Sequence, residues 1–177
     1  MSLVLATMHG PHIDWPSFAP IVILALGALV VLLAGLLGRV VRERAVPVLT
    51  IATLIAAIID DAFRLPHPAA IVSGALSVDG LALVLDLIFA AAAIATVLIS
   101  QRTRAPASAG HGEYHSLLLF SVFGMAVLVS AQNLVTLFIG FELLSIPLYV
   151  LCASEFRREG SLESGLKYLV IGSVGSA

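Results

Sequence analysis

Residues 17–38 read SFAPIVILALGALVVLLAGLLG and contain no charged side chain. A helix of about 20 apolar residues is long enough to cross the hydrocarbon core of a bilayer, so this stretch predicts a transmembrane helix. Residues 1–16 contain no lysine or arginine and therefore lack the positively charged start of a secretory signal. We predict that residues 1–16 form an external N-terminal segment that leads into this first helix.

The composition extends this prediction to the whole chain. Of the 177 residues, 60% are hydrophobic and 11% are charged, and the mean hydropathy is +1.09. Soluble domains average about 45–50% apolar and about 25% charged residues. One water-soluble core could not enclose so many apolar side chains, which excludes a soluble enzyme and a disordered protein. The net charge of -2 excludes a nucleic-acid-binding protein, and the single cysteine, Cys152, excludes an internal disulfide.

Apolar stretches recur along the chain and are separated by polar links. We predict an all-α polytopic membrane protein whose transmembrane domain covers residues 17–177. Its six predicted spans are 17–38, 46–63, 80–100, 115–131, 134–153 and 162–177. Helices are expected because a backbone exposed to hydrocarbon must satisfy its own hydrogen bonds. A membrane β-barrel would need alternating polarity in short segments, and these runs show none.

The arginines predict how the chain is oriented in the membrane. The predicted links on one side carry Arg39, Arg42, Arg44, Arg102, Arg104, Arg157 and Arg158. The opposite side carries only Arg64. Because positive residues concentrate in cytoplasmic loops, we expect the N-terminus to face outside. The last predicted span ends without a polar tail, so we expect a portion of a longer protein or one piece of a split one.

Two ionisable residues fall inside predicted spans. Glu142 lies eight residues from one end of its span and eleven from the other. A charged residue at the bilayer centre costs about 2.5–3.5 kcal/mol and usually serves an ion path. Lys167 lies about five residues inside its span, so its long side chain could still reach the headgroups. We predict that both belong to a proton path. The alternatives are a hydrogen-bonded packing glutamate and an interfacial lysine.

Three further residues are weaker candidates for the surroundings of this path. Asp86 lies about six residues into the third predicted span, where it could instead be a packing carboxylate near the headgroups. Pro147 removes a backbone hydrogen bond in the helix of Glu142, which either frees a carbonyl for water or only bends the helix. His115 could collect protons at the inner surface. The histidines share no helix face with a carboxylate at ligand spacing, so we expect no metal site.

The second half of the chain resembles a known family. Three stretches carry the resemblance: EYHSLLLFSVFGM at 113–125, ELLSIPLY at 142–149 and ESGLKY at 163–168. They are similar to subunit N of the proton-pumping NADH-quinone oxidoreductase, respiratory complex I. The first hundred residues match that family only as apolar helices, with SVDG at 77–80 before the third span.

The resemblance implies the first part of an antiporter-like bundle built from inverted repeats, in which Glu142 and Lys167 match protonatable residues of the proton path. It also implies an enzyme subunit, a translocase, that holds no redox cofactor. NADH, FMN, iron-sulfur clusters and quinone would bind partner subunits, and the direct partners would be other membrane subunits of the complex. An energy-transducing membrane, such as the bacterial plasma membrane, is the expected location.

Two other functions stay open at this point. A subunit of a multisubunit sodium/proton antiporter shares the buried glutamate and lysine. A non-transporting structural or assembly fragment would insert and pack without moving protons.

Overall fold

The computed structural model describes residues 14–38, 41–64, 69–72 and 75–176. Within them, five helices are long and apolar enough to cross a membrane. They are α1 (Trp15–Gly35), α2 (Val46–Arg64), α3 (Gly80–Ser100), α5 (His111–Ser130) and α6 (Leu134–Cys152). The remaining elements are η1 (Val41–Ala45), β1 (Ala69–Val72), β2 (Leu76–Val78), α4 (Ala105–Ala109) and α7 (Glu159–Ser176). The chain is therefore an integral membrane protein, as predicted.

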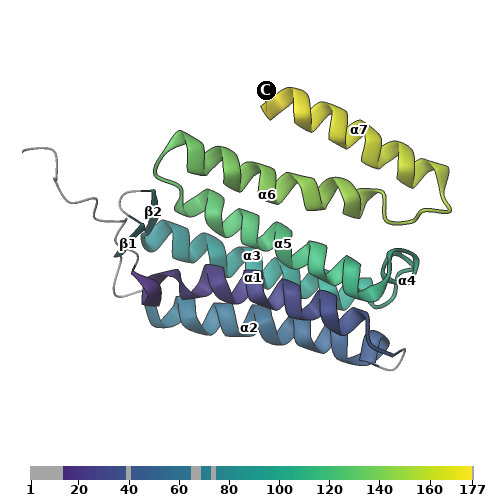
Figure 1. The fold of residues 1–177 in the computed structure, drawn as a ribbon, viewed down its shortest axis with the longest axis horizontal. Coiled ribbons are helices and arrows are strands. Elements are labelled where there is room, and N and C mark those ends of the chain that lie inside the picture. Colours follow the sequence, from purple (N-terminus) through teal and green to yellow (C-terminus); the bar gives the residue numbers. More distant parts are fainter. Residues whose placement is uncertain (1–13, 39–40, 65–68, 73–74, 177) are drawn as a thin grey trace, which may run out of the picture.

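The long helices lie side by side along the long axis of the molecule (Figure 1). Helix α5 packs against α1, α3 and α6, and it is the most extensively buried of the five apolar helices in the described residues. Helix α7 packs along α6 at the edge of the bundle (Figure 1). The region that holds Glu142 and Lys167 thus consists of α6 and α7, and it rests on α5.

Small residues let α5 approach α1 closely. A Cβ placed on Gly112 would lie 2.6 Å from the Cα of Gly35, so the two backbones touch at this point. One turn further along α5, the buried hydroxyl of Ser116 donates a hydrogen bond of 2.9 Å to the carbonyl oxygen of Ala28 in α1. Glycine and serine at such contacts are typical of packed membrane helices, because they permit close van der Waals contact and interhelical hydrogen bonds.

Side-chain caps fix the starts of two helices. The carboxylate of Asp79 accepts a hydrogen bond of 2.8 Å from the backbone N–H of Ala82 at the start of α3. The side-chain oxygen of Asn133 accepts one of 2.8 Å from the N–H of Thr136 at the start of α6. Both residues satisfy a backbone donor that has no partner within its helix.

The short elements were not predicted. Strands β1 and β2 pair antiparallel between α2 and α3, with Ala69 opposite Val78. Helix α4 occupies the polar link between α3 and α5. These segments are too short to show a hydrophobic period of their own, so the sequence carried no signal for them.

That residues 162–177 cross the membrane remains a prediction. Its described residues, 162–176, lie in α7, whose 18 residues include Glu159, Glu163 and Lys167. Helix α7 is accordingly not among the five helices that are apolar enough to cross a membrane in the described part of the chain. Most of the predicted external segment, residues 1–13, lies outside the described residues.

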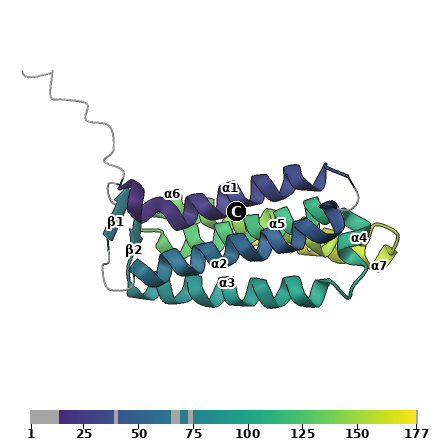
Figure 2. The same cartoon turned by 90° about the horizontal axis from the view of Figure 1, so that it is seen from below.

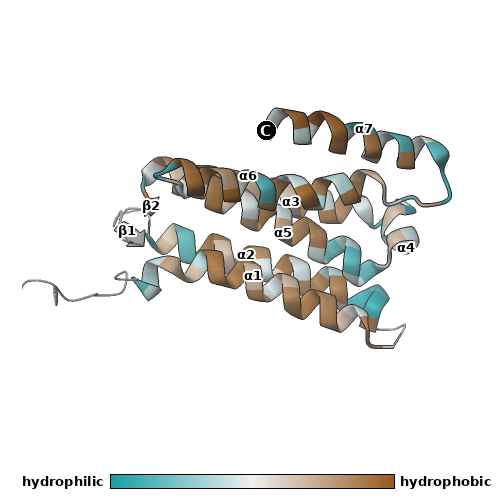
Figure 3. Cartoon of the chain, turned by 45° about the horizontal axis from the view of Figure 1, so that its top comes forward, coloured by the Kyte–Doolittle hydropathy of each residue, from teal (hydrophilic) through white to brown (hydrophobic). Residues whose placement is uncertain are grey.

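Large apolar side chains cover the outside of the bundle, and Figure 3 shows apolar residues along all of the long helices. Those that are exposed include Leu26, Val30, Leu33, Val48, Ile55, Ile59, Val84, Ile88, Leu98, Leu137, Phe138 and Ile146. A soluble monomer rarely exposes so large an apolar surface, whereas lipid tails contact it without cost.

The described arginines divide between the two ends of the bundle. One end holds η1, the α3–α5 link that contains α4, and the α6–α7 link, which together carry Arg42, Arg44, Arg102, Arg104, Arg157 and Arg158 (Figure 2). Arg64 lies at the other end, beside the β-hairpin. This separation agrees with the charge asymmetry expected from the sequence, although Arg39 lies outside the described residues.

Ser116→Ala should lower the free energy of unfolding by about 1 kcal/mol, because hydrogen bonds between transmembrane helices contribute on average about 0.6 and at most about 1.7 kcal/mol. Unfolding of the purified protein by detergent titration measures the change. Ser164→Ala is the matched control, since its hydroxyl is exposed and bonds only to Gly160 in its own helix. Equal stability of the two variants would contradict a role for the α1–α5 hydrogen bond.

Candidate functional site

Glu142 lies in α6 beside the closest contact between α5 and α6. A Cβ placed on Gly124 of α5 would lie 2.7 Å from the Cα of Leu144, and a Cβ on Gly140 of α6 would lie 2.7 Å from the backbone nitrogen of Leu128. Real side chains do not approach so closely, so both glycines are required for this packing. Glu142 lies between these two contact points, and the packing therefore fixes its rotation and depth.

The position of Glu142 along the bundle follows from this packing. Gly124 faces residues 143–144 and Leu128 faces Gly140, so Glu142 is level with about residue 126 of α5. Within α6 it is eight residues from the start and ten from the end. Its side chain is half-buried, and it has no hydrogen-bond or ion-pair partner among the described residues. An unpaired carboxylate thus lies near the middle of an apolar helix.

Pro147 is buried within α6, which continues through it without a break. A proline has no N–H, so the carbonyl of Leu143, four residues earlier, loses its usual helical donor. Leu143 directly follows Glu142. A backbone carbonyl without its helical donor therefore lies next to the unpaired carboxylate, an arrangement that a water molecule could bridge.

Lys167 lies on α7 and does not contact Glu142. Its ammonium pairs with the carboxylate of Glu163 at 2.6 Å, and the two side chains are 68% and 64% exposed. Such exposed pairs one helical turn apart contribute only about 0.3–0.5 kcal/mol. Lys167 is therefore accessible from outside the bundle of the described residues, and its present partner is on its own helix.

The close contacts between α7 and α6 lie at Tyr149 and Ala153, beyond Glu142 toward the end of α6. The rings of Tyr149 and Tyr168 meet edge to face with centroids 4.9 Å apart, and Gly165 packs against Ala153. Because the helices are antiparallel, this register places Lys167 level with residues 150–151 of α6 and about 13 Å from Glu142 along the helix axis. The structure brings the two residues to neighbouring helices without joining them.

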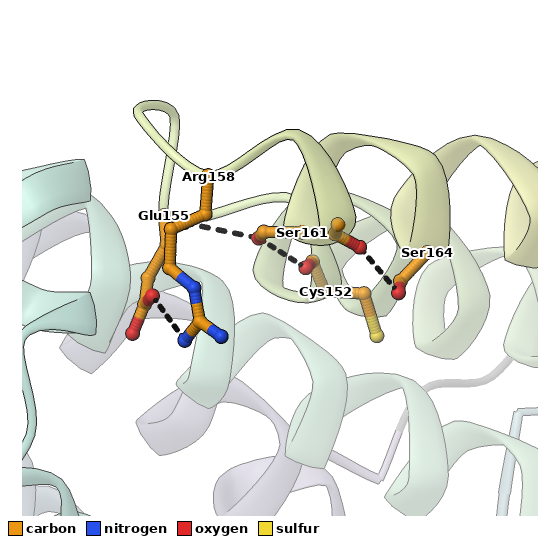
Figure 4. A network of polar contacts seen from close by, with 6 residues as sticks. Cys152, Glu155, Arg158, Ser161 and Ser164 are labelled. Carbon is orange, nitrogen blue, oxygen red and sulfur yellow. Dashed lines mark hydrogen bonds and ion pairs between the residues drawn. The ribbon is translucent and has the colours of Figure 1, made fainter.

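A polar link holds the start of α7 to the end of α6 (Figure 4). The hydroxyl of Ser161 donates to the carbonyl oxygen of Cys152 at 2.9 Å and accepts from the N–H of Glu155 at 3.3 Å. The carboxylate of Glu155 also pairs with Arg158 at 2.9 Å. These contacts set the position from which α7 departs, and hence where Lys167 lies relative to α6.

His115 is fully buried in α5. Its Nδ1 lies 2.7 Å from the carbonyl oxygen of His111, and its Nε2 lies 3.4 Å from the side-chain nitrogen of Gln101. A carbonyl only accepts hydrogen bonds, so Nδ1 carries the proton and Nε2 accepts from the Gln101 amide. The neutral ring thus has both of its nitrogen atoms satisfied.

Asp86 lies on α3, which packs against α2 and α5. One of its carboxylate oxygens is buried without a partner in the described residues. Sequence reasoning missed a second such group, Asp61 of α2, which is only 3% exposed and also has a buried oxygen without a partner. Its spacing in the sequence could have revealed it: Asp61 continues the three- and four-residue intervals of the buried residues of α2, whereas the adjacent Asp60 does not. No group of three metal-ligating side chains gathers in the described ranges.

The comparisons with known proteins agree with these features. Residues 131–177, which contain Glu142, Pro147 and Lys167, match the family model described as NADH:quinone oxidoreductase/Mrp antiporter, TM. Subunit N of NADH-quinone oxidoreductase from Cutibacterium acnes is 32% identical over 98% of this chain. The subunit N 2 protein from Roseiflexus castenholzii is 35% identical over 92% of it.

The fold also matches a solved structure. A chain of respiratory complex I from Thermus thermophilus with bound aureothin superimposes with a TM-score of 0.75 and 29% identity, and the match covers 89% of this chain. The chain spans 37% of the Cutibacterium relative, 33% of the Roseiflexus relative and 34% of the Thermus chain. The predicted resemblance is therefore confirmed over about a third of these proteins.

Gly124→Val should prevent α6 from packing on α5, because the added side chain would overlap the backbone of Leu143 and Leu144. We expect the yield of folded protein in the membrane to fall several-fold, as measured by fluorescence-detected size exclusion in mild detergent. Gly175→Val is the control, because a Cβ at that position meets no atom within 4 Å. An unchanged yield for Gly124→Val would show that the α5–α6 contact does not position Glu142.

Proposed function

We propose that this chain, which is similar in sequence and fold to subunit N of NADH-quinone oxidoreductase, is part of an antiporter-like subunit that moves protons across the membrane. The observation that carries the proposal is Glu142, which has no partner in the part of the chain that the structure describes. It lies near the middle of α6, on the glycine-lined contact with α5 and within the segment matched by the antiporter family model. A carboxylate in this position costs about 2.5–3.5 kcal/mol on insertion scales, and such residues usually serve an ion path.

In this proposal Glu142 takes up and releases a proton. The free carbonyl of Leu143 beside it offers a place for the water molecule that delivers the proton. Lys167 is a second protonatable site at the edge of the bundle. The separation of about 13 Å along the helix axis is too large for direct transfer, so water or a further side chain must connect the two.

The proposal assigns the oxidation of NADH and the reduction of quinone to partner subunits. The chain then contributes to a proton-translocating enzyme, a translocase, without redox chemistry of its own. Its partners are the other membrane subunits of the complex, and its location is the bacterial plasma membrane, since the relatives named above are bacterial. Asp86, Pro147 and His115 remain candidates for groups that tune the path.

A subunit of a sodium/proton antiporter is the second candidate, because the matching family model covers Mrp antiporters as well as the oxidoreductase. The two candidates differ in what drives transport. An oxidoreductase subunit moves protons only when NADH is oxidised, whereas an antiporter responds to an imposed sodium gradient.

Glu142→Gln should leave the complex assembled but lower NADH-driven proton translocation at least several-fold, because an amide cannot carry a proton through the site. Membrane vesicles from the native organism, with a pH-sensitive dye and a parallel assay of quinone reduction, measure both rates. Glu159→Gln is the matched control, since that glutamate lies exposed in the first turn of α7.

Three results would decide between the candidate functions. NADH-driven proton translocation that falls in Glu142→Gln but not in Glu159→Gln supports a role as an oxidoreductase subunit. A proton flux that follows the sodium gradient without NADH identifies the antiporter. Unchanged transport in an assembled Glu142→Gln complex would leave only the structural role.

A further inference from the structure

A line of inward-facing residues runs along α2 and ends in an acid. The buried residues Val46, Thr50, Leu54, Ala57 and Asp61 recur at three- and four-residue intervals, the spacing of one helix face. Asp61 is therefore on the face that enters the bundle, and it is only 3% exposed.

The neighbouring Asp60 points elsewhere. Its carboxylate accepts hydrogen bonds from Nε and Nη2 of Arg64, at 2.6 and 3.1 Å. This pair lies one helical turn apart on α2, and it satisfies the arginine that lies nearest to Asp61. The cation at this end of the bundle is thus already bound to another acid.

Helix α3 shows the same pattern. Its buried residues Leu83, Ala90, Ala93, Val97 and Ser100 keep three- and four-residue intervals if position 86 is included between the first two. Asp86 occupies that position, and one of its carboxylate oxygens is fully buried without a partner. An acid thus replaces an apolar residue on the inward face of each helix.

The two acids lie at one place in the fold. Helices α2 and α3 pack side by side and run antiparallel from the β-hairpin that joins them (Figure 2). Asp61 is three residues from the end of α2 and Asp86 is six from the start of α3, so their depths differ by only about 4–5 Å. The two acids therefore lie at similar depth on packed helices, each on the face that enters the bundle.

No other charged group balances this pair in the described residues. Asp79 caps α3, and Asp14 accepts a hydrogen bond from Ser17 at the start of α1. The titratable residues of α5, which packs on both helices, all lie in its first turns at the opposite end: His111, Glu113, Tyr114 and His115. Apart from Arg64, the charged residues named at this end of the bundle are all acids.

Two ionised carboxylates that are buried together without a cation would repel each other and lose their hydration, which is costly. A single shared proton removes one of the two charges and hence the repulsion, because the protonated acid donates a hydrogen bond to a carboxylate oxygen of the other. We propose that Asp61 and Asp86 share one proton and form an internal proton-binding site where α2 ends and α3 begins. This site is separate from Glu142 and Lys167, and it does not depend on the proposed function.

Infrared spectroscopy tests the shared proton directly. The protein, purified with its native partners from cells grown on aspartate labelled with carbon-13 at the side-chain carboxyl, is reconstituted in lipid. The carbonyl stretch of a protonated aspartic acid is then followed from acid to alkaline pH. We expect one protonated aspartic acid per chain at neutral pH, and we expect its band to be lost in both Asp61→Asn and Asp86→Asn.

Asp60→Asn is the matched control, since it removes the adjacent acid that pairs with Arg64, and it should keep the band. Absence of the band from the wild-type protein at neutral pH would overturn the proposal, including the case in which a sodium ion binds two ionised carboxylates. Retention of the full band in either single variant would overturn it as well. Absence of the wild-type band overturns the proposal even if a variant does not fold, and proton transport plays no part in the measurement.

Discussion

The close contact of α5 with its neighbours is the constraint on which the rest of the structure depends. Gly112 meets Gly35 of α1 backbone to backbone, and Gly124 meets α6 in the same way. In lipid there is no hydrophobic force between helices, so van der Waals contact and interhelical hydrogen bonds must hold them together. Glycine allows that contact, and α6 thereby presents Glu142 at a defined depth.

Charged residues in this apolar bundle fall into two groups. Asp60 with Arg64, and Glu163 with Lys167, form pairs one turn apart on a single helix. Glu142 has no partner in the described residues, and the buried oxygens of Asp61 and Asp86 have none either. The first group follows from local spacing and stabilises little. The second group is costly to bury, so its members are the stronger candidates for function.

Much of the fold could be predicted from the sequence. The predicted span 80–100 coincides with α3, and the predicted spans 46–63 and 134–153 each end within one residue of their helices. Long apolar runs without alternating polarity predict helices, because a backbone in hydrocarbon must satisfy its hydrogen bonds within the segment. The predicted start at 115 missed the first turn of α5, because His111 and Glu113 are polar but lie within the helix. Glu142 was found because it interrupts an apolar run.

The sequence by itself determined that this is a helical membrane protein related to an antiporter-like subunit, and that Glu142 lies deep within one helix. Composition and helical periodicity are local properties, so they can be determined from the sequence alone. Only the tertiary structure decided the surroundings of the charges: Lys167 pairs with Glu163 rather than approaching Glu142, and Asp61 is buried in the bundle while Asp60 pairs with Arg64. Those choices depend on how each helix is rotated against its neighbours, and that rotation arises from contacts between segments far apart in the chain.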